Sequence, residues 1–258
     1  MQISLNTDAP VERSLRNVLP LIRDVGFEAV DMTWPPVASG SDVNRDPSEE
    51  LGALLAESGL KLAGLGVGAF TAIEEGALPE AVAACRERMR WARESGLRSV
   101  SLRAGDRGRQ SWELLYRGLK ALLADAEASG LTILLANAYG TRIEQLDDLR
   151  RVFIELDDPH LGVLLDAGQF HSAAVNPRDA LAELWHRVRF VRLGDRIGRR
   201  PVPLGRGETN VPAIIEDLHR RGYDGPLSVE LPPHEPGELE ALLCNTHHDL
   251  HRMLQTDR

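Results

Sequence analysis

Residues 188–231 read VRFVRLGDRIGRRPVPLGRGETNVPAIIEDLHRRGYDGPLSVEL. The stretch opens with a short apolar run over 188–193 and closes with a second one over 226–231, each typical of a buried strand. Between them, Ile214, Ile215 and Leu218 have the spacing of one apolar helix face. Gly222 then precedes the second strand, as a helix C-capping glycine does. The pattern predicts a strand–helix–strand unit, which joins parallel strands.

The same alternation of strand and helix patterns runs through the whole chain. The predicted strands are QISLN (2–6), AVDMT (29–33), KLAGLGV (61–67), RSVSLRA (98–104), LTILLA (131–136), LGVLLD (161–166), VRFVRL (188–193) and PLSVEL (226–231). Gly26, Gly59, Gly96 and Gly130 fall between a helical pattern and the next strand. Eight such units predict one (β/α)₈ TIM barrel over residues 1–258. A doubly wound open sheet is the alternative, but no GxGxxG motif follows the first strand.

Composition bounds the partners of the chain. The formal net charge is −9, which argues against nucleic acid and against an anionic membrane as partners. No stretch reaches the ~18 apolar residues of a membrane helix, and the N-terminus shows no basic leader. The two cysteines, Cys85 and Cys244, form no CxxC motif, so we expect neither a disulfide framework nor a zinc knuckle. The sequence therefore favours a cytoplasmic protein with a small-molecule substrate.

Polar residues gather where the predicted strands end, which is where barrels of this kind carry their chemistry. Asp166, Arg192 and Glu230 end three consecutive strands and are the catalytic candidates. The substrate-binding candidates are Trp34, Arg103, Asn137, Tyr139, Gln169, His171, Asp195 and Arg206. Carboxylates and histidines suit general acid–base work. The arginine-rich segment at 196–208 is either an anion-binding loop or a solvated charged loop, and the connection at 34–48 is a candidate lid.

Three segments carry a family resemblance. PLGRGETNVPAIIEDLHRRGYDGPLSVEL (203–231) resembles the xylose-isomerase-like TIM barrels, the sugar phosphate isomerase/epimerase superfamily. Their pattern there is a Leu-Gly-x-Gly-Glu loop, a helix, Gly-Tyr-x-Gly-Pro and a strand that ends in Glu. LGVLLDAGQF (161–170) resembles their sixth strand, and ILLANAYGT (133–141) resembles their fifth. The resemblance implies a (β/α)₈ barrel with an isomerase or epimerase site.

The resemblance also implies a metal site that this chain has altered. The family holds one divalent ion, often manganese, with Glu, Asp, His and Glu at the ends of strands 5 to 8. Those positions fall on Ala136, Asp166, Arg192 and Glu230, so only Asp166 and Glu230 are retained. A guanidinium carries only donors and stays charged, so it cannot bind a cation. We therefore expect no metal or other cofactor, with Arg192 standing where the ion stood and bridging Asp166 and Glu230.

Three functions remain open from the sequence. The first is an isomerase, epimerase or related lyase on a small polyhydroxylated carbonyl compound, without the metal and with Arg192 or Arg103 holding an anionic substrate group. The second is a manganese enzyme with a displaced site that still uses Asp166 and Glu230. The third is a catalytically silent barrel that binds a small anionic ligand or a partner protein. Barrels of this family often pair, so a homodimer stays open.

Overall fold

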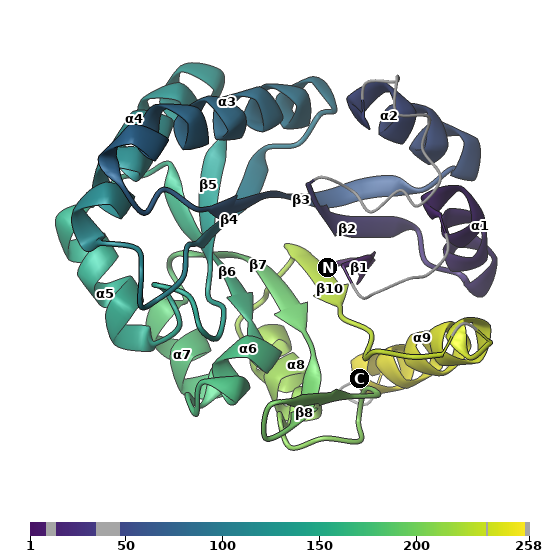
Figure 1. The fold of residues 1–258 in the computed structure, drawn as a ribbon. Helices are drawn as coiled ribbons and strands as arrows, with labels where there is room; N and C mark the ends of the chain where they lie inside the picture. The colour runs from purple at the N-terminus through teal and green to yellow at the C-terminus, as the bar shows by residue number, and fades with distance from the viewer. Residues whose placement is uncertain (9–13, 35–46, 236, 256–258) are drawn as a thin grey trace.

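Eight parallel strands close into a barrel in the computed structural model, which describes residues 1–8, 14–34, 47–235 and 237–255 (Figure 1). Around the barrel the order is β1-β10-β7-β6-β5-β4-β3-β2. The strands are β1 (Gln2–Asn6), β2 (Ala29–Thr33), β3 (Lys61–Phe70), β4 (Ser99–Ala104), β5 (Thr132–Ala136), β6 (Leu161–Asp166), β7 (Val188–Leu193) and β10 (Pro226–Val229). The predicted (β/α)₈ barrel is confirmed.

The helices form a ring outside the barrel (Figure 1). They are α1 (Leu15–Val25), α2 (Pro47–Ser58), α3 (Leu78–Glu94), α4 (Trp112–Ser129), α5 (Leu146–Glu155), α6 (Ala167–Ser172), α7 (Pro177–Leu184), α8 (Val211–Arg220) and α9 (Leu239–Gln255), with the short 3₁₀ turn η1 (Glu75–Ala77) before α3. The predicted stripes face inward: in α8, for example, Ile214, Ile215 and Leu218 are fully buried. All five predicted capping glycines have positive φ, which a residue without Cβ adopts at little cost.

The segment after β7 differs from the prediction of a plain loop. It contains an antiparallel hairpin of β8 (Asp195–Ile197) and β9 (Arg200–Val202), which turns at Gly198. Helix α8 then begins at Val211, after Asn210 in a left-handed conformation, rather than directly after Gly207. The cause is local, because a two-residue turn with positive φ closes a tight hairpin that helix and strand patterns alone do not reveal.

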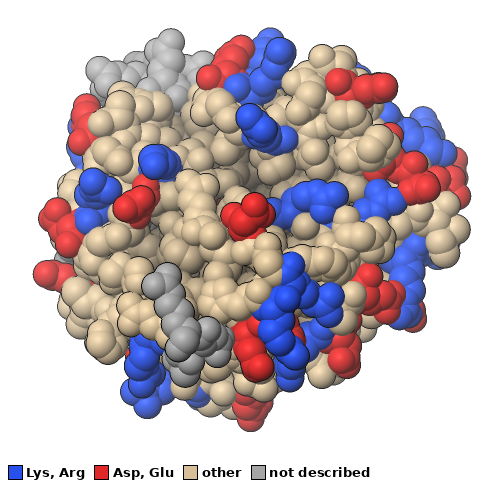
Figure 2. Space-filling model, turned by 180° about the vertical axis from the view of Figure 1, so that it is seen from behind, with Lys and Arg blue, Asp and Glu red and all other residues tan. Residues whose placement is uncertain are grey.

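Side chains that point inward fill the barrel below its mouth. Leu134, Ala136, Leu164 and Phe190 form one apolar cluster there, with exposures of 3% or less. On the face turned away in Figure 1, basic and acidic side chains lie side by side (Figure 2). Among the described residues, no helix is long and apolar enough to cross a membrane. The candidate lid at 34–48 lies largely outside the described residues, since 35–46 are not among them.

Candidate functional site

The strand register brings the two strongest sequence candidates side by side. Asp166, at the end of β6, is the direct neighbour of Arg192 on β7. Because side chains at matched positions point to the same face of a sheet, both enter the barrel mouth. On the other side of β7, Arg192 is level with Ser228 of β10. Glu230 therefore lies two residues farther along its strand, roughly 6.6 Å nearer the open end.

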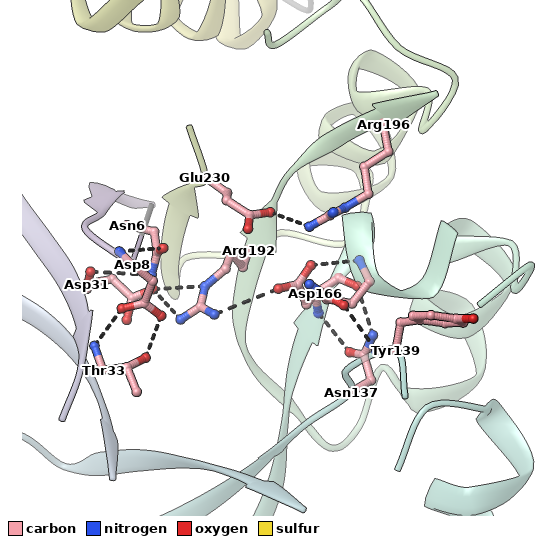
Figure 3. A network of polar contacts seen from close by, with 11 residues as sticks. Asn6, Asp8, Asp31, Thr33, Asn137, Tyr139, Asp166, Arg192, Arg196 and Glu230 are labelled. Carbon is pink, nitrogen blue, oxygen red and sulfur yellow. Dashed lines mark hydrogen bonds and ion pairs between the residues drawn. The ribbon is translucent and has the colours of Figure 1, made fainter. Parts of the chain in front are cut away.

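The Arg192 side chain crosses the mouth to β2 instead of bridging its two neighbours (Figure 3). Its Nε and Nη2 both donate to Oδ2 of Asp31, at 3.0 and 2.7 Å. Its Nη1 lies 3.8 Å from Oδ2 of Asp166 and makes no hydrogen bond to another described residue. The side chains of Arg192 and Asp31 are 9% and 1% exposed, so the pair is buried. Two of the three guanidinium nitrogens are thus committed to Asp31, and the third faces Asp166.

The predicted contact between Arg192 and Glu230 is wrong. Glu230 instead accepts a 2.8 Å hydrogen bond from Nη2 of Arg196, which extends from β8 (Figure 3). The physical reason is the register, since Glu230 lies above the level of Arg192. Arg196 reaches it because the hairpin turns this residue inward, where its side chain is only 7% exposed. The mouth therefore holds two arginine–carboxylate pairs, one above the other.

Asp166 is fixed from below by Asn137, the residue after β5. The amide of Asn137 donates to the backbone carbonyl of Asp166 at 2.9 Å, and its Oδ1 accepts from the Asp166 N–H at 2.9 Å. The carboxylate also caps α6 by accepting from the N–H of Gln169. These contacts hold the carboxyl group rigidly against the mouth, with one oxygen, Oδ2, left toward Arg192.

The surroundings shift the protonation of Asp166. Burial raises its pKa, the nearby charge of Glu230 raises it further, and Arg192 opposes both, which leaves a pKa of about 7 against an ordinary value of 3.8. Burial alone would lower the pKa of Arg192, but the charges of Asp31 and Asp166 outweigh it and raise that pKa. Near neutral pH, Asp166 can therefore both take and give a proton, while Arg192 stays a cation.

Several predicted substrate-binding residues have structural partners. Both carboxylate oxygens of Asp195 accept backbone N–H groups, from Arg196, Gly207 and Thr209, so this buried side chain organises the segment after β7. The Gln169 side chain accepts from the N–H of Tyr139. Another of the predicted residues, His171, has its Nε2 3.7 Å from a carboxylate oxygen of Glu208.

The two aromatic candidates, Tyr139 and Trp34, have contacts of their own. The Tyr139 ring points away from Arg192 (Figure 3), is 42% exposed and lies under the Arg199 guanidinium at 4.4 Å. Trp34 packs against Trp91 at 5.4 Å between ring centroids. Neither of these contacts involves Arg192, Asp166 or Glu230. A ring packed over those three residues would have favoured a silent barrel.

The two remaining arginine candidates are exposed. Arg103 occupies β4 two residues after Ser101, which lines the barrel interior, so strand alternation directs Arg103 toward the mouth. It forms no ion pair with another described residue. Arg206 lies on the surface of the β9–α8 connection, where its backbone N–H donates to Pro203. Of the two, only Arg103 is on a barrel strand.

The residues at the family's four ligand positions do not fit a divalent ion. Ala136 has no side-chain atom that can coordinate a metal ion, and it packs in the apolar cluster with Leu134, Leu164 and Phe190. Arg192 offers only hydrogen-bond donors. Among the described residues, no group of three or more His, Cys, Asp or Glu side chains is arranged to hold a metal ion.

The comparison with known families agrees with the barrel. The model of the xylose isomerase-like TIM barrel family matches residues 19–244. The chain belongs to this family. Its fold matches a xylose isomerase domain protein from Alicyclobacillus acidocaldarius, with a TM-score of 0.77 at 20% identity over 98% of both chains. A 3-keto-D-glucoside 4-epimerase from E. coli gives a TM-score of 0.76 at 17% identity, again over 98% of both.

The sequence of this xylose isomerase-like barrel also matches part of a curated enzyme. An inosose dehydratase from Clostridium botulinum is 25% identical over 141 residues. The match spans 47% of the chain and 47% of that relative, so the chain aligns with about half the length of the dehydratase.

Sequence reasoning missed the roles of Asp31 and Arg196. Asp31 is the middle residue of β2 and the single acidic residue in a mostly apolar strand, and that isolation was the available signal. Its partner is 161 residues away, so no local pattern could identify it. Arg196 was one of several arginines in a charged segment, and only the hairpin distinguishes it from Arg199 and Arg200.

Proposed function

We propose that this chain is an isomerase, epimerase or related lyase that acts on a small polyhydroxylated carbonyl compound without the divalent metal usual in its family. The observation that carries the proposal is the buried carboxyl of Asp166, with a pKa of about 7, facing an uncommitted nitrogen of Arg192. A proton carrier of matched pKa beside a fixed cation is what the removal of a proton next to a carbonyl group requires.

The chemistry follows from those two groups. The carboxylate of Asp166 takes the proton from a carbon next to the substrate carbonyl, and the electron pair of that C–H bond moves to the carbonyl oxygen. Nη1 of Arg192 stabilises the resulting oxyanion, because it is a charged donor in a site of low polarity. If a proton is added to the former carbonyl carbon while the hydroxyl proton of the first carbon passes to the oxyanion, a new carbonyl forms at the first carbon and the product is an isomer. If Glu230 instead delivers a proton to the opposite face of the first carbon, while Asp166 keeps the proton that it took, the product is an epimer. If the oxyanion re-forms the carbonyl and its electron pair expels the hydroxyl on the next carbon, which leaves as water with the proton that Asp166 had taken, the product is dehydrated.

The net charge at the mouth indicates which groups could bind an anionic substrate. Asp31, Asp166 and Glu230 with Arg192 and Arg196 leave a formal charge of −1, so these five groups do not attract an anion. Arg103 is exposed near the mouth end of β4 and forms no ion pair with a described residue. We assign to it the anionic group of the substrate, a carboxylate or a phosphate.

Deuterium exchange tests the reaction. The protein is incubated in D₂O with neutral ketoses, keto-cyclitols and their carboxylated or phosphorylated counterparts, and proton NMR follows each sample. The proposal expects loss of the proton next to the carbonyl in at least one compound, with or without new alkene signals from dehydration. Asp166→Asn should abolish it. Asp148→Asn, which alters a buried aspartate that caps α5 outside the mouth, should not.

Arg103→Met tests the anion assignment separately. The variant should raise KM for an anionic substrate about tenfold or more and leave KM for its neutral counterpart unchanged. Arg206→Met, at a second exposed arginine, serves as the matched control.

The alternative is a catalytically silent barrel, and one observation favours it. Arg192 and Arg196 are already neutralised by carboxylates of the chain, so neither carries a net charge that is free for a ligand. Ligand binding without proton exchange, for any compound of the panel, would support that alternative against the enzyme.

A further inference from the structure

Asp31 has no role in the chemistry above, yet it is the residue that Arg192 binds most closely. Its Oδ2 accepts three hydrogen bonds, from Nε and Nη2 of Arg192 and from the side chain of Asn6 at 3.1 Å. Its Oδ1 has no hydrogen-bond partner among the described residues. An aspartate whose role was only to satisfy hydrogen bonds would use both carboxylate oxygens. Here one oxygen accepts all of them, two from Arg192, which indicates that this side chain holds Arg192 in place.

The neighbouring strands leave room for this arrangement. In register Asn6 is beside Asp31, and the next strand contributes Gly64. A Cβ on Gly64 would come within 2.8 Å of Asp31 Oδ1 and 2.6 Å of the Phe190 ring. The carboxylate is therefore held in one orientation by packing on one side and by hydrogen bonds on the other.

Besides Asp31, the described carboxylate that forms an ion pair with the guanidinium is Asp166. Its Oδ2 is 3.8 Å from Nη1, close enough that a small rotation would form a direct pair. Asp8, the other acidic residue near this end of the mouth, has both oxygens occupied by the backbone and hydroxyl of Thr33. Among the described residues, Asp166 is therefore the acidic side chain with an oxygen left to face Arg192, and it is the proposed proton carrier.

We propose that Asp31 is a positioning residue, which anchors two nitrogens of Arg192 on β2 so that Nη1 stays available to a ligand oxygen above Asp166. The kinetic consequence rests on the proposed function, whereas the structural claim does not. The anchor prevents the cation from collapsing onto the carboxylate that must exchange a proton.

Nitrogen-15 NMR of arginine side chains tests the structural claim directly. In the wild-type protein the Arg192 Nε–H signal, assigned with Arg192→Lys, should exchange slowly with water because it is buried and hydrogen-bonded. Asp31→Asn, which keeps the shape and removes the charge, should shift that signal and speed its exchange on the order of tenfold or more. Asp31→Ala should enlarge both effects. If Asp31→Ala fails to fold, Asp31→Asn alone decides.

The matched control lies on the outer ring. There Nε of Arg178 donates to Asp217 at 2.6 Å, the same contact in a more exposed setting. Asp217→Asn should change the Arg178 signal and leave that of Arg192 unaltered. An Arg192 signal unchanged in both Asp31 variants would overturn the proposal.

Kinetics on a substrate found by deuterium exchange complete the test. Asp31→Asn should lower kcat about tenfold or more with KM within about twofold, since the misplaced cation acts on the oxyanion rather than on binding. A kcat equal to that of the wild type would overturn the positioning role. If no substrate exchanges while the NMR signals respond as expected, the proposed function fails and the anchoring of Arg192 by Asp31 stands.

Discussion

The arginines of the mouth and those of the outer helical ring form ion pairs of the same chemistry in opposite surroundings. Arg86 of α3 pairs with Asp125 of α4, and their side chains are 51% and 39% exposed. Arg192 and Asp31 are 9% and 1% exposed. Water screens the first pair, whereas the second had to lose its water on folding. The buried pair therefore holds a charge at a fixed position in the mouth, and its desolvation lowers stability in a way that does not apply to the exposed outer pairs.

Removal of the mouth cation should have the largest effect. Arg192→Met leaves the carboxylate of Asp31 buried without a countercharge, which should lower the free energy of unfolding by about 3–5 kcal/mol. Urea denaturation measures it. Adding Asp31→Asn to Arg192→Met should restore part of the loss, because the orphaned charge is gone. A single-variant loss below about 1 kcal/mol would mean that water reaches the pair as it reaches the outer ring.

The second-largest expected effect is the pH dependence of the free energy of unfolding. Because the pKa of Asp166 is about 7 in the folded chain and the ordinary value is 3.8, the folded state holds a proton that the unfolded state has released between these values. The stabilisation is complete below about pH 4 and is lost as pH rises to about 7, on the order of a few kcal/mol.

The comparison of wild type with Asp166→Asn isolates this effect, since the other titrating groups cancel. The difference in free energy of unfolding should fall from pH 4 to 7 and then stay level. A difference that is flat over that range, or that rises, would refute the elevated pKa.

A purely steric substitution tests how tightly the region around Asp31 is packed relative to the outer ring, without altering any charge. Gly64→Ala places a methyl group against Phe190 and Asp31, which should cost about 1–3 kcal/mol by overpacking. Thermal or urea unfolding measures it. Gly52→Ala in α2 is the control, because no atom lies within 4 Å of the new methyl there, and it should stabilise the helix by up to about 1 kcal/mol. Equal effects at the two sites would show that the space beside Asp31 is not tight.

The outer ring should show the smallest effect. Arg86→Met breaks an exposed pair and should change the free energy of unfolding by less than about 1 kcal/mol, less still at high salt. Urea unfolding at low and high ionic strength measures it. A loss as large as that of Arg192→Met would erase the distinction between the two classes of pair.

The fold followed from local patterns, whereas the site followed from them only in part. Strand periodicity placed Asp166 and Arg192 on neighbouring strands and directed both into the mouth, as the register shows. The partner of Arg192 could not be predicted, because Asp31 is three strands away around the closed barrel and contact depends on the reach of one long side chain. The Arg196–Glu230 pair depends on a hairpin whose strands have only three residues each.

The central claim is that the Arg192 guanidinium occupies the place of the family's metal ion. Titration of manganese into the wild-type protein, followed by calorimetry, tests this claim most directly. The account predicts no stoichiometric binding to the wild type and a gain of binding in the Ala136→Glu, Arg192→His double variant, which restores two ligands. One tightly bound ion per wild-type chain, lost in Asp166→Asn, would contradict it.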